Sequence, residues 1–400
     1  MTGTDSGPSR ITVTGSVIAS ITPAADAPAE DPAGPRPAVL DADGRYAVPG
    51  MVNAHDHLYS HELRDPLPGQ GIAGMRALLD ARSDAETLLR MLSAARAELA
   101  CGITAIRDLG APAGLNTVLA GLLDREVVTG PAVLASGRAV VMTGGHVWTF
   151  GREADGPWDC RRAVREQAKA GARVIKIMGS GGLSHYPAED FTAVQFTDRE
   201  LAAIIDESHR AGLPCCAHVF GADAVARVVR LGVDCVEHGV QIDPATLDLM
   251  AERGVGYVPT LTNMERIASA EYNSHAGTPE RSEVLTAGVV RPHRDTVRRA
   301  IAAGVRIAVG TDSTGSYPEE LRRLSDLGLS SVQVLAAATV AGAEVLRIPG
   351  GRIAVGQPAD LALHRTNPLQ RLESLTAPDY VIRRGRVEHG PLAGLTGGAP

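Results

Sequence analysis

The chain has 400 residues, 44% of them hydrophobic and 21% charged, which is the balance of an ordinary globular protein. A net charge of −7 and an aromatic content of 3% argue against a nucleic-acid partner, which would need basic patches and stacking platforms. No apolar run approaches the ~20 residues of a membrane span, and the first residues lack the apolar core of a signal peptide. We therefore expect a cytoplasmic protein without a membrane partner, whose five cysteines are small buried thiols, and we leave a homo-oligomer open.

The two ends of the chain carry β-type patterns. Residues 1–10 are polar and rich in Gly and Ser, which predicts a disordered N-terminus. Residues 11–21 alternate like a half-buried strand, and residues 37–50 are typical of a hairpin around Asp43 and Gly44. Short strand patterns return in residues 350–364 and 380–390. We predict one small β-sandwich domain made from both termini, over residues 11–50 and 350–400.

The central residues 51–349 repeat a strand and helix pattern eight times. Short β-branched or apolar runs alternate with segments whose apolar residues recur at i, i+3, i+4 and i+7, as in helices that cover a sheet. Eight such units predict an α/β fold, a (β/α)8 barrel of the TIM type. The predicted strands are 51–57, 102–110, 132–140, 172–179, 213–220, 234–239, 254–261 and 305–313, and the predicted helices are 86–100, 115–126, 160–170, 198–211, 222–232, 244–254 and 293–304.

Histidines and one aspartate lie at the ends of predicted strands. His55 and His57 alternate along the first strand, so both rings face one side. His218 ends the fifth strand, His238 the sixth, and Asp312 follows the eighth. Because the carboxyl ends of parallel barrel strands gather on one face, we expect these side chains to meet around a zinc-like ion. Asp312 could also act as a general base, or could cap the segment that follows it.

Lys176 lies inside an apolar strand pattern, where an unpaired ammonium is costly to bury. Burial and nearby cations favour the neutral amine, which can add carbon dioxide and become an anionic carbamate. A Schiff-base lysine, or a lysine paired with a buried carboxylate, would also explain the position. The surrounding histidines favour the carbamate, as a bridge between two metal ions.

Sequence motifs along nearly the whole chain resemble the amidohydrolase superfamily, in particular its metal-dependent dipeptidase and prolidase-like branch. The motifs are PGMVNAHDHL, GITAIRDLG, TGGH, IKIMGSGG, AHVFGADAV, VEHG, VPTL, GTDS and GRIAVGQPADL. The resemblance implies a distorted (β/α)8 barrel with a β-sandwich-like domain, and two divalent ions of the zinc type. It implies that one ion is held by His55, His57 and Asp312, and the other by His218 and His238, with a Lys176 carbamate between them.

The chain departs from this pattern at two places. Relatives usually carry a hydrophobic or Thr residue between the first two histidines, whereas this chain has Asp56, which we expect to be a polar residue at the rim. An Asn-Pro-Ala helix start is replaced by Ala341-Gly342-Ala343. Neither departure affects a predicted ligand, and both leave open a substrate other than a plain dipeptide.

Other polar residues are candidates for supporting roles. His146 is a candidate substrate contact or oxyanion stabiliser, although a loop histidine without a role is the alternative. Asp108 could orient a ligand histidine or make a structural hydrogen bond. Glu237 should point away from His238 and is expected to be structural. Arg64 and Arg152 could bind a substrate carboxylate, or could be solvated surface arginines.

These residues predict hydrolysis of an amide-type C–N bond in a small-molecule substrate such as a dipeptide or an N-acyl amino acid. Two metal ions would activate a water between them, and Asp312 would take its proton and pass it to the leaving amine. The alternatives are a mononuclear deaminase, which would not need Lys176, a lactone hydrolase on the same site, and a non-catalytic barrel. The sequence does not rank the possible substrates.

Overall fold

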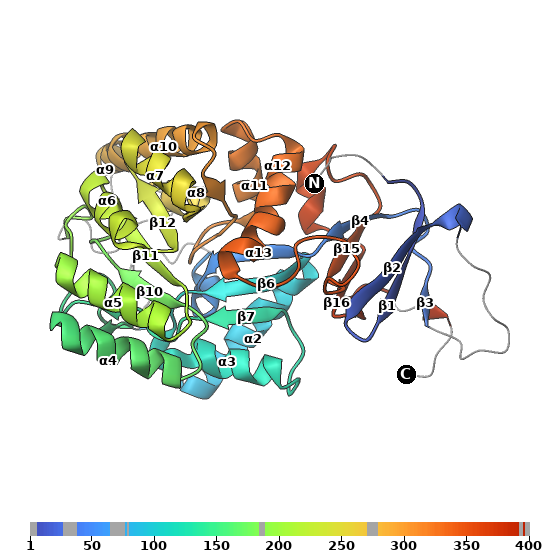
Figure 1. The fold of residues 1–400 in the computed structure, drawn as a ribbon, viewed down its shortest axis with the longest axis horizontal. Coiled ribbons are helices and arrows are strands. Elements are labelled where there is room, and N and C mark those ends of the chain that lie inside the picture. The colour runs from blue at the N-terminus through green and yellow to red at the C-terminus, as the bar shows by residue number, and fades with distance from the viewer. Residues whose placement is uncertain are drawn as a thin grey trace.

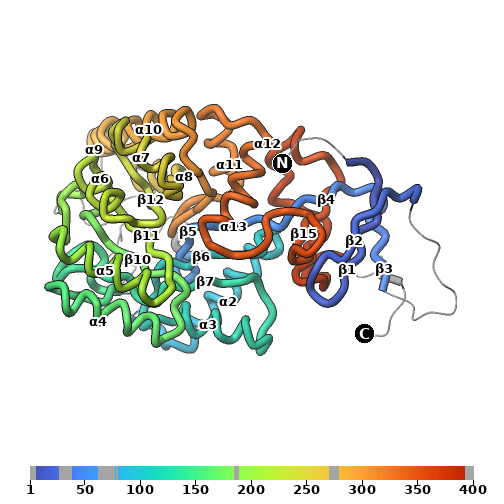
Figure 2. Tube along the Cα trace, viewed as in Figure 1, coloured from blue at the N-terminus to red at the C-terminus, as the bar shows by residue number. Residues whose placement is uncertain are grey.

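The computed structural model describes residues 6–26, 38–64, 77, 80–183, 189–269, 279–391 and 395–396. Strands surrounded by helices make up the larger part of the molecule, and a β-rich part that contains β1, β2, β3, β4, β15 and β16 lies beside it (Figure 1). The chain leaves the β-rich part after β4, builds the larger part, and returns to it at β15 (Figure 2).

Parallel strands form the barrel that the sequence predicts. Two sheets are joined at two seams, where Arg173 N donates to Ala135 O at 2.8 Å and Ala54 N donates to Val309 O at 2.7 Å. All eight predicted strand positions are confirmed, and the strands are β5 (Met51–Asp56), β6 (Ile103–Asp108), β7 (Ala132–Ala135), β10 (Ile175–Met178), β11 (Cys215–Phe220), β12 (Cys235–Val240), β13 (Gly256–Val258) and β14 (Arg306–Ile307), with the short strands β8 (Val140–Val141) and β9 (Arg152–Glu153) beside β10.

The helices cover the outside of this barrel (Figure 1). Helix α5 starts with a capping box, in which the Thr197 hydroxyl accepts from Glu200 N and the Glu200 carboxylate accepts from Thr197 N, so two helix-end donors are satisfied. All seven predicted helices are present. The helices of the described ranges are α2 (Asp84–Ala100), α3 (Leu115–Asp124), α4 (Gly156–Lys169), α5 (Asp198–Arg210), α6 (Ala222–Leu231), α7 (Pro244–Arg253), α8 (Leu261–Ala268), α9 (Pro279–Leu285), α10 (Arg291–Ala302), α11 (Tyr317–Asp326), α12 (Ser331–Ala338) and α13 (Val340–Leu346). Short helical turns are η1 (Ala24–Asp26), η2 (Leu58–Arg64), η3 (Pro112–Gly114), η5 (Thr286–Val290) and η6 (Leu372–Thr376).

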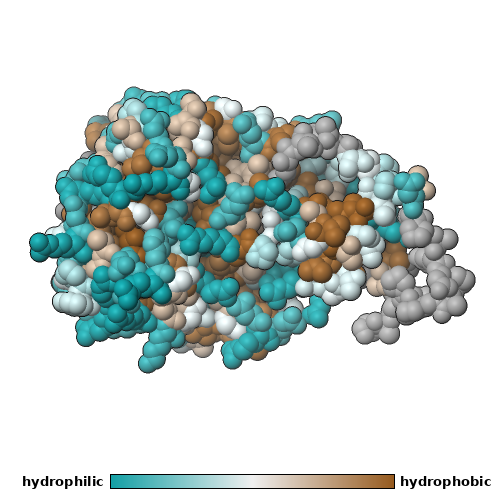
Figure 3. Space-filling model, viewed as in Figure 1, coloured by the Kyte–Doolittle hydropathy of each residue, from teal (hydrophilic) through white to brown (hydrophobic). Residues whose placement is uncertain are grey.

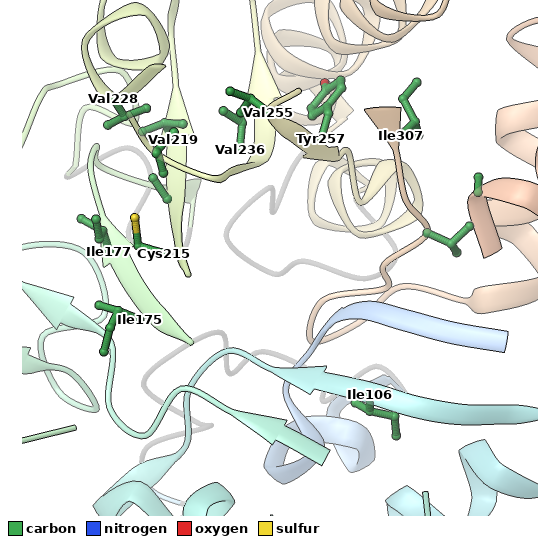
Figure 4. Packing of buried hydrophobic residues seen from close by; sticks show 14 of the residues in the cluster. Ile106, Ile175, Ile177, Cys215, Val219, Val228, Val236, Val255, Tyr257 and Ile307 are labelled. Atoms are coloured by element: carbon green, nitrogen blue, oxygen red, sulfur yellow. The ribbon is translucent and has the colours of Figure 1, made fainter. Parts of the chain in front are cut away.

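The apolar core has two layers, because successive strand residues face opposite sides. Cys215 belongs to the cluster between the strands and the helices, whereas Cys216 belongs to the cluster inside the barrel. In the outer layer, Val228 of α6 lies beside Val219 of β11 (Figure 4). Four of the five cysteines are buried and all five are free thiols. The strand ends are therefore held in a packed scaffold.

The β-rich part is built from both termini, as predicted. An antiparallel sheet has the order β17 (Arg386–His389), β16 (Tyr380–Arg383), β15 (Leu361–His364), β4 (Tyr46–Pro49). Two further pairs are β1 (Ser9–Thr14) with β2 (Val17–Pro23), and β3 (Val39–Leu40) with β18 (Leu395–Thr396). The domain limits at residues 50 and 350 stay our proposal.

Three local predictions in this part need correction. The turn at Asp43 and Gly44 exists, but the flanking strands β3 and β4 pair with β18 and β15, so no hairpin forms there. The segment 11–21 is a two-stranded hairpin with a positive φ at Gly15, not one strand. Strand β1 begins at Ser9, inside the segment 1–10 that we expected to be disordered, while residues 1–5 lie outside the described residues.

The surface of the two parts differs in polarity. Hydrophobic side chains gather over β1 and β2, where Val17 and Ile21 are exposed, whereas the helices present mostly polar side chains (Figure 3). Of the helices that the structure describes, none is long and apolar enough to cross a membrane.

Candidate metal centre

The ends of the barrel strands surround a cavity that is open to solvent. All of the predicted ligands line it, and they come from four strands and the segment after β14: His55, His57, Lys176, His218, His238 and Asp312. Their meeting point is the carboxyl end of the barrel, as predicted from strand order.

Each of the four histidines has one ring nitrogen held by a protein oxygen. The contacts are His55 Nδ1 to Glu237 Oε2 at 2.8 Å, His57 Nδ1 to Gly110 O at 2.9 Å, His218 Nε2 to Gly181 O at 3.0 Å, and His238 Nδ1 to Thr260 Oγ1 at 2.7 Å. The second nitrogen of each ring is left for a metal ion, which is how ligand histidines are usually oriented.

The environment keeps three of these rings neutral. Burial, reinforced by the charge of Lys176, lowers the pKa of His55 to about 4. Burial also holds the pKa of His218 and that of His238 well below the ordinary value, and neighbouring imidazoles add to both shifts. Because a metal ligand must be an unprotonated imidazole, this electrostatic setting suits a cation.

The free ring nitrogens of His55 and His57 both lie near Asp312. Its Oδ1 lies 3.5 Å from Nε2 of His57 and 3.8 Å from Nε2 of His55. One ligand atom each from His55, His238 and Asp312 lie within 4.8 Å of one another, and the His218 and His238 rings are 4.6 Å apart. The donor set fits a divalent transition-metal ion.

The backbone at His238 explains why the prediction for Glu237 was wrong. Simple strand alternation would place the two side chains on opposite faces. However, His238 has a φ of 64°, in the left-handed region, and this breaks the alternation at the end of β12. Both residues therefore contact His55: Glu237 by its carboxylate, and His238 through rings 5.1 Å apart.

Asp312 is held by its neighbours as an ionised carboxylate. Its Oδ1 accepts from Ser313 N at 2.6 Å and from Ser313 Oγ at 2.9 Å, and its Oδ2 accepts from Asn263 Nδ2 at 2.7 Å. Although burial alone would raise its pKa, electrostatic interactions with His55, His57 and Lys176 keep the pKa of Asp312 below the ordinary value. An ionised carboxylate can bind a metal and accept a proton.

Lys176 is 1% exposed, and its Nζ has no hydrogen-bond partner within the described part of the chain. A buried ammonium without a partner is costly, so one of the alternatives, a lysine paired with a buried carboxylate, finds no support among those residues. An amine here lies among neutral imidazoles and next to Asp312, and this is the setting in which a further ligand group is expected.

His146 lines the same cavity from the loop after β8. Its ring stacks on His218 at 4.5 Å, and its Nδ1 lies 3.2 Å from Glu189 Oε2. Gly182 makes room for the ring, because a Cβ at that position would lie 2.2 Å from the His146 Cε1 atom. The structure thus brings His146 to the metal ligands, and its chemical role remains a proposal.

Within the described ranges, Asp108 makes no hydrogen bond to a histidine side chain, although it interacts electrostatically with His57. Its carboxylate accepts from Leu58 N at 3.1 Å and Gly110 N at 3.2 Å, and the Gly110 carbonyl binds His57. Burial raises the pKa of Asp108 to about 6. Asp108 therefore acts on His57 both by direct electrostatic attraction and through the backbone of Gly110.

Two predictions for polar residues need correction, and one is left untested. Arg152 does not line the cavity, because its guanidinium pairs with Asp159 at 2.9 Å and Glu166 at 2.7 Å. Asp56 is fully buried rather than at the rim, and it contacts His61 at 2.9 Å. The side chain of Arg64 lies outside the described residues.

Several supporting residues were not named from the sequence, and Glu237 was given a structural role only. Arg107 and Glu237 are charged residues inside apolar strand patterns, which is a signal that could have found them. Helix α8 was not predicted. Its Asn263 hydrogen-bonds Asp312, and Thr260, the residue before the helix, hydrogen-bonds His238. Glu320 of α11 caps this helix, since its carboxylate accepts the backbone N–H groups of residues 261 and 262 at 2.8 Å each.

The remaining wall of the cavity is apolar. One side has Tyr59 and Phe150, whose rings are 5.8 Å apart. The lining further includes Val147, Met178, Leu183, Phe220, Met264 and Ile267. Such a wall favours apolar groups on a small-molecule ligand.

Comparison with known proteins gives the same family from sequence and from structure. The amidohydrolase family model matches residues 46–390. An uncharacterised protein of Mycobacterium tuberculosis is 30% identical over 86% of this chain and 85% of its own length. Ochratoxinase of Aspergillus niger is 30% identical over 74% of this chain and 67% of its length. A prolidase crystallised with N-methylphosphonate-L-proline has a TM-score of 0.80 and 28% identity, with 95% and 94% of the chains covered. The chain belongs to the amidohydrolase family, whose members generally use divalent metals and act on small molecules.

Proposed function

We propose that the protein is a metal-dependent hydrolase that cleaves an amide-type C–N bond in a dipeptide or an N-acyl amino acid-like molecule. The observation that carries the proposal is the buried Nζ of Lys176, which has no hydrogen-bond partner among the described residues and lies in one cavity with neutral imidazoles and Asp312. The family supports hydrolysis at C–N bonds, and the structural neighbours include a prolidase and an ochratoxinase.

We assign two metal positions to the centre. His55, His57 and Asp312 would hold one ion, His218 and His238 the other, and Lys176 as a carbamate would lie between them. The carbamate forms when the neutral amine attacks carbon dioxide, which makes an N–C bond and releases one proton. Divalent ions, most simply zinc, would supply an activated water and polarise the substrate carbonyl.

The choice of lysine at position 176 supports the carbamate. Only two of the 39 basic residues in the chain are lysines, Lys169 and Lys176, and the other 37 are arginines. An arginine stays protonated in proteins and has no free amine, so it could not form this ligand. A chain that uses arginine at 37 of its 39 basic positions therefore has a lysine at a buried position where an amine is useful.

The protein groups around the cavity would carry the proton transfers. Asp312 would accept a proton from the attacking water and return it to the leaving nitrogen. His146 would donate a hydrogen bond to the carbonyl oxygen as negative charge develops on it. The apolar wall with Tyr59 and Phe150 would bind an apolar side chain of the substrate, and Arg64 stays a predicted partner of a substrate carboxylate.

The test is a substrate screen of the zinc-loaded enzyme with dipeptides, N-acyl amino acids, lactones and amino-heterocycles. We expect release of a free amine and a new carboxylate from a peptide or acyl-amino-acid member. The control is Asp312→Asn, which should lose several orders of magnitude in turnover, since general-base catalysis alone contributes ~10²–10⁴. Ammonia release from a heterocycle with all amides inert would mean a deaminase, and turnover of lactones alone would remove the amide assignment.

A further inference from the structure

The four imidazoles of the centre are held by unequal partners. Three of them contact an uncharged carbonyl or hydroxyl oxygen, as described above. Among the described residues, His55 is the one ligand histidine with a hydrogen bond to a carboxylate, and its Nδ1 lies 2.8 Å from Oε2 of Glu237. A hydrogen bond to a carboxylate is stronger than one to a carbonyl, and it makes the imidazole a better metal ligand. Of the four rings, His55 is therefore the strongest donor.

Glu237 is in turn paired with a buried guanidinium. Nη2 of Arg107 lies 2.6 Å from Oε1 of Glu237, and Nε of Arg107 donates to the carbonyl of Ala54 at 2.5 Å. Glu237 is 0% exposed and Arg107 is 2% exposed. Both contact the thiols inside the barrel, which belong to an otherwise apolar cluster. The pair thus links β6 and β12 to His55 on β5, below the cavity.

A contribution to folding stability is a weak explanation for the presence of this buried ion pair. Moving two charges out of water costs several kcal/mol for each ion, and an apolar pair of similar volume often holds a core equally well. The pair has a direct contact to a ligand ring, however, and this contact gives it an effect that an apolar pair would lack.

We propose that Arg107 and Glu237 are positioning residues that make the metal position of His55, His57 and Asp312 the tighter of the two. The inference rests on the proposed function, since it requires two ions. Glu237 fixes the proton of His55 on Nδ1 and leaves Nε2 facing the cavity, 3.8 Å from Oδ1 of Asp312. Arg107 balances the charge of the carboxylate and fixes its second oxygen.

The experiment measures zinc affinity in two backgrounds that each retain one position. His218→Ala leaves the first position complete, and His57→Ala leaves the second. Glu237→Gln keeps the shape of the side chain and an acceptor oxygen but removes the charge. In the His218→Ala background we expect Glu237→Gln to weaken zinc binding about 10–100-fold, which is the usual cost of losing the hydrogen-bond partner of a ligand histidine. In the His57→Ala background we expect Glu237→Gln to change the zinc affinity by less than threefold. Competition with a chromophoric chelator measures the affinity in both backgrounds.

Two further variants control for folding. Glu207→Gln removes another buried glutamate, which pairs with Arg165 at 2.7 Å on the helical layer, and it should leave both affinities unchanged. Arg107→Met combined with Glu237→Gln leaves no unpaired charge in the core. If the single variant fails to fold, this double variant tests the same loss of zinc affinity, and circular dichroism shows whether each variant is folded.

The outcomes separate the two proposals. If wild-type protein binds two zinc ions but Glu237→Gln weakens both positions equally, or leaves the first position unchanged, the positioning role is overturned and the binuclear hydrolase stands. If metal-free wild-type protein takes up fewer than two ions, the proposed metal centre falls, and the inference falls with it. If Glu237→Gln weakens zinc binding only at the position of His55, His57 and Asp312, the result supports both the binuclear hydrolase and the positioning role.

Discussion

The side-chain amide of Asn263 donates to Oδ2 of Asp312 at 2.7 Å, from a helix that the sequence did not reveal. This contact fixes the plane of the carboxylate, while Ser313 occupies the other oxygen. The Asp312 carboxylate is thus oriented before any substrate arrives, and pre-orientation of this kind is what catalysis requires.

We predict that Asn263→Ala lowers kcat by about 10–100-fold, because the carboxylate loses the donor that orients it. Asn263→Asp should be worse, since it places a second negative charge beside Asp312. Steady-state kinetics with the substrate found in the screen would measure both. Equal activity of wild type and Asn263→Ala would show that Ser313 alone suffices.

Replacing Lys176 by Ala should reduce the zinc content from two ions per chain to at most one. Lys169, the other lysine, is exposed on α4, so Lys169→Ala is a matched control that should keep both ions. After exposure to ¹³C-labelled bicarbonate, a carbamate signal should be present in wild type and in Lys169→Ala and absent in Lys176→Ala. Two tightly bound ions in the Lys176 variant would argue against the bridge.

Gly182→Ala should lower kcat by about 10²-fold, because the new Cβ would displace His146, and losing one oxyanion donor costs ~10²–10³. The double variant with His146→Ala should be no slower than His146→Ala alone, since both changes act on one group. Gly121→Ala, at an α3 position with open space, should be neutral. Additive losses in the double variant would mean that Gly182 acts by another route.

Glu320 should make stability depend on pH. Although the hydrogen bonds from residues 261 and 262 oppose the shift, burial raises its pKa from 4.5 to about 7. The folded state therefore binds more protons than the unfolded state between these values, and stability falls as pH rises through this window. The shift corresponds to about 3 kcal/mol.

The variant Glu320→Gln lacks this titration. We expect the unfolding free energy of wild type, relative to the variant, to fall by about 3 kcal/mol between pH 4.5 and 8. Urea unfolding of the two metal-free proteins at several pH values measures the difference in their unfolding free energies. The contributions of the other titrating groups cancel in this difference. A difference that stays constant with pH would show that Glu320 is ionised throughout.

The barrel was predictable because each strand and helix carries its own periodicity, and strand order then places five ligand-bearing segments on one face. What the sequence did not reveal depends on contacts between distant residues. The strands on either side of Asp43 and Gly44 pair with the C-terminal strands, so local turn chemistry predicted a hairpin that does not form. Asp56 is buried because His61, five residues later, turns back onto it.

The role of Glu237 was missed for a different reason. Alternation along a strand is a reliable rule only while the backbone stays extended, and the left-handed conformation of His238 ends it. Arg152 was misassigned because its partners Asp159 and Glu166 lie on the next helix, α4, and no strand-end argument includes them.

Both His238 and Asp312 have left-handed backbone conformations, with φ values of 64° and 56°. Such a conformation costs a non-glycine residue roughly 1–2 kcal/mol. Glycine at either position would relieve that cost and remove a ligand at the same time. Laboratory evolution that selects for heat tolerance alone would therefore drift towards an inert barrel, and any programme to make this enzyme more robust must select for turnover in every round.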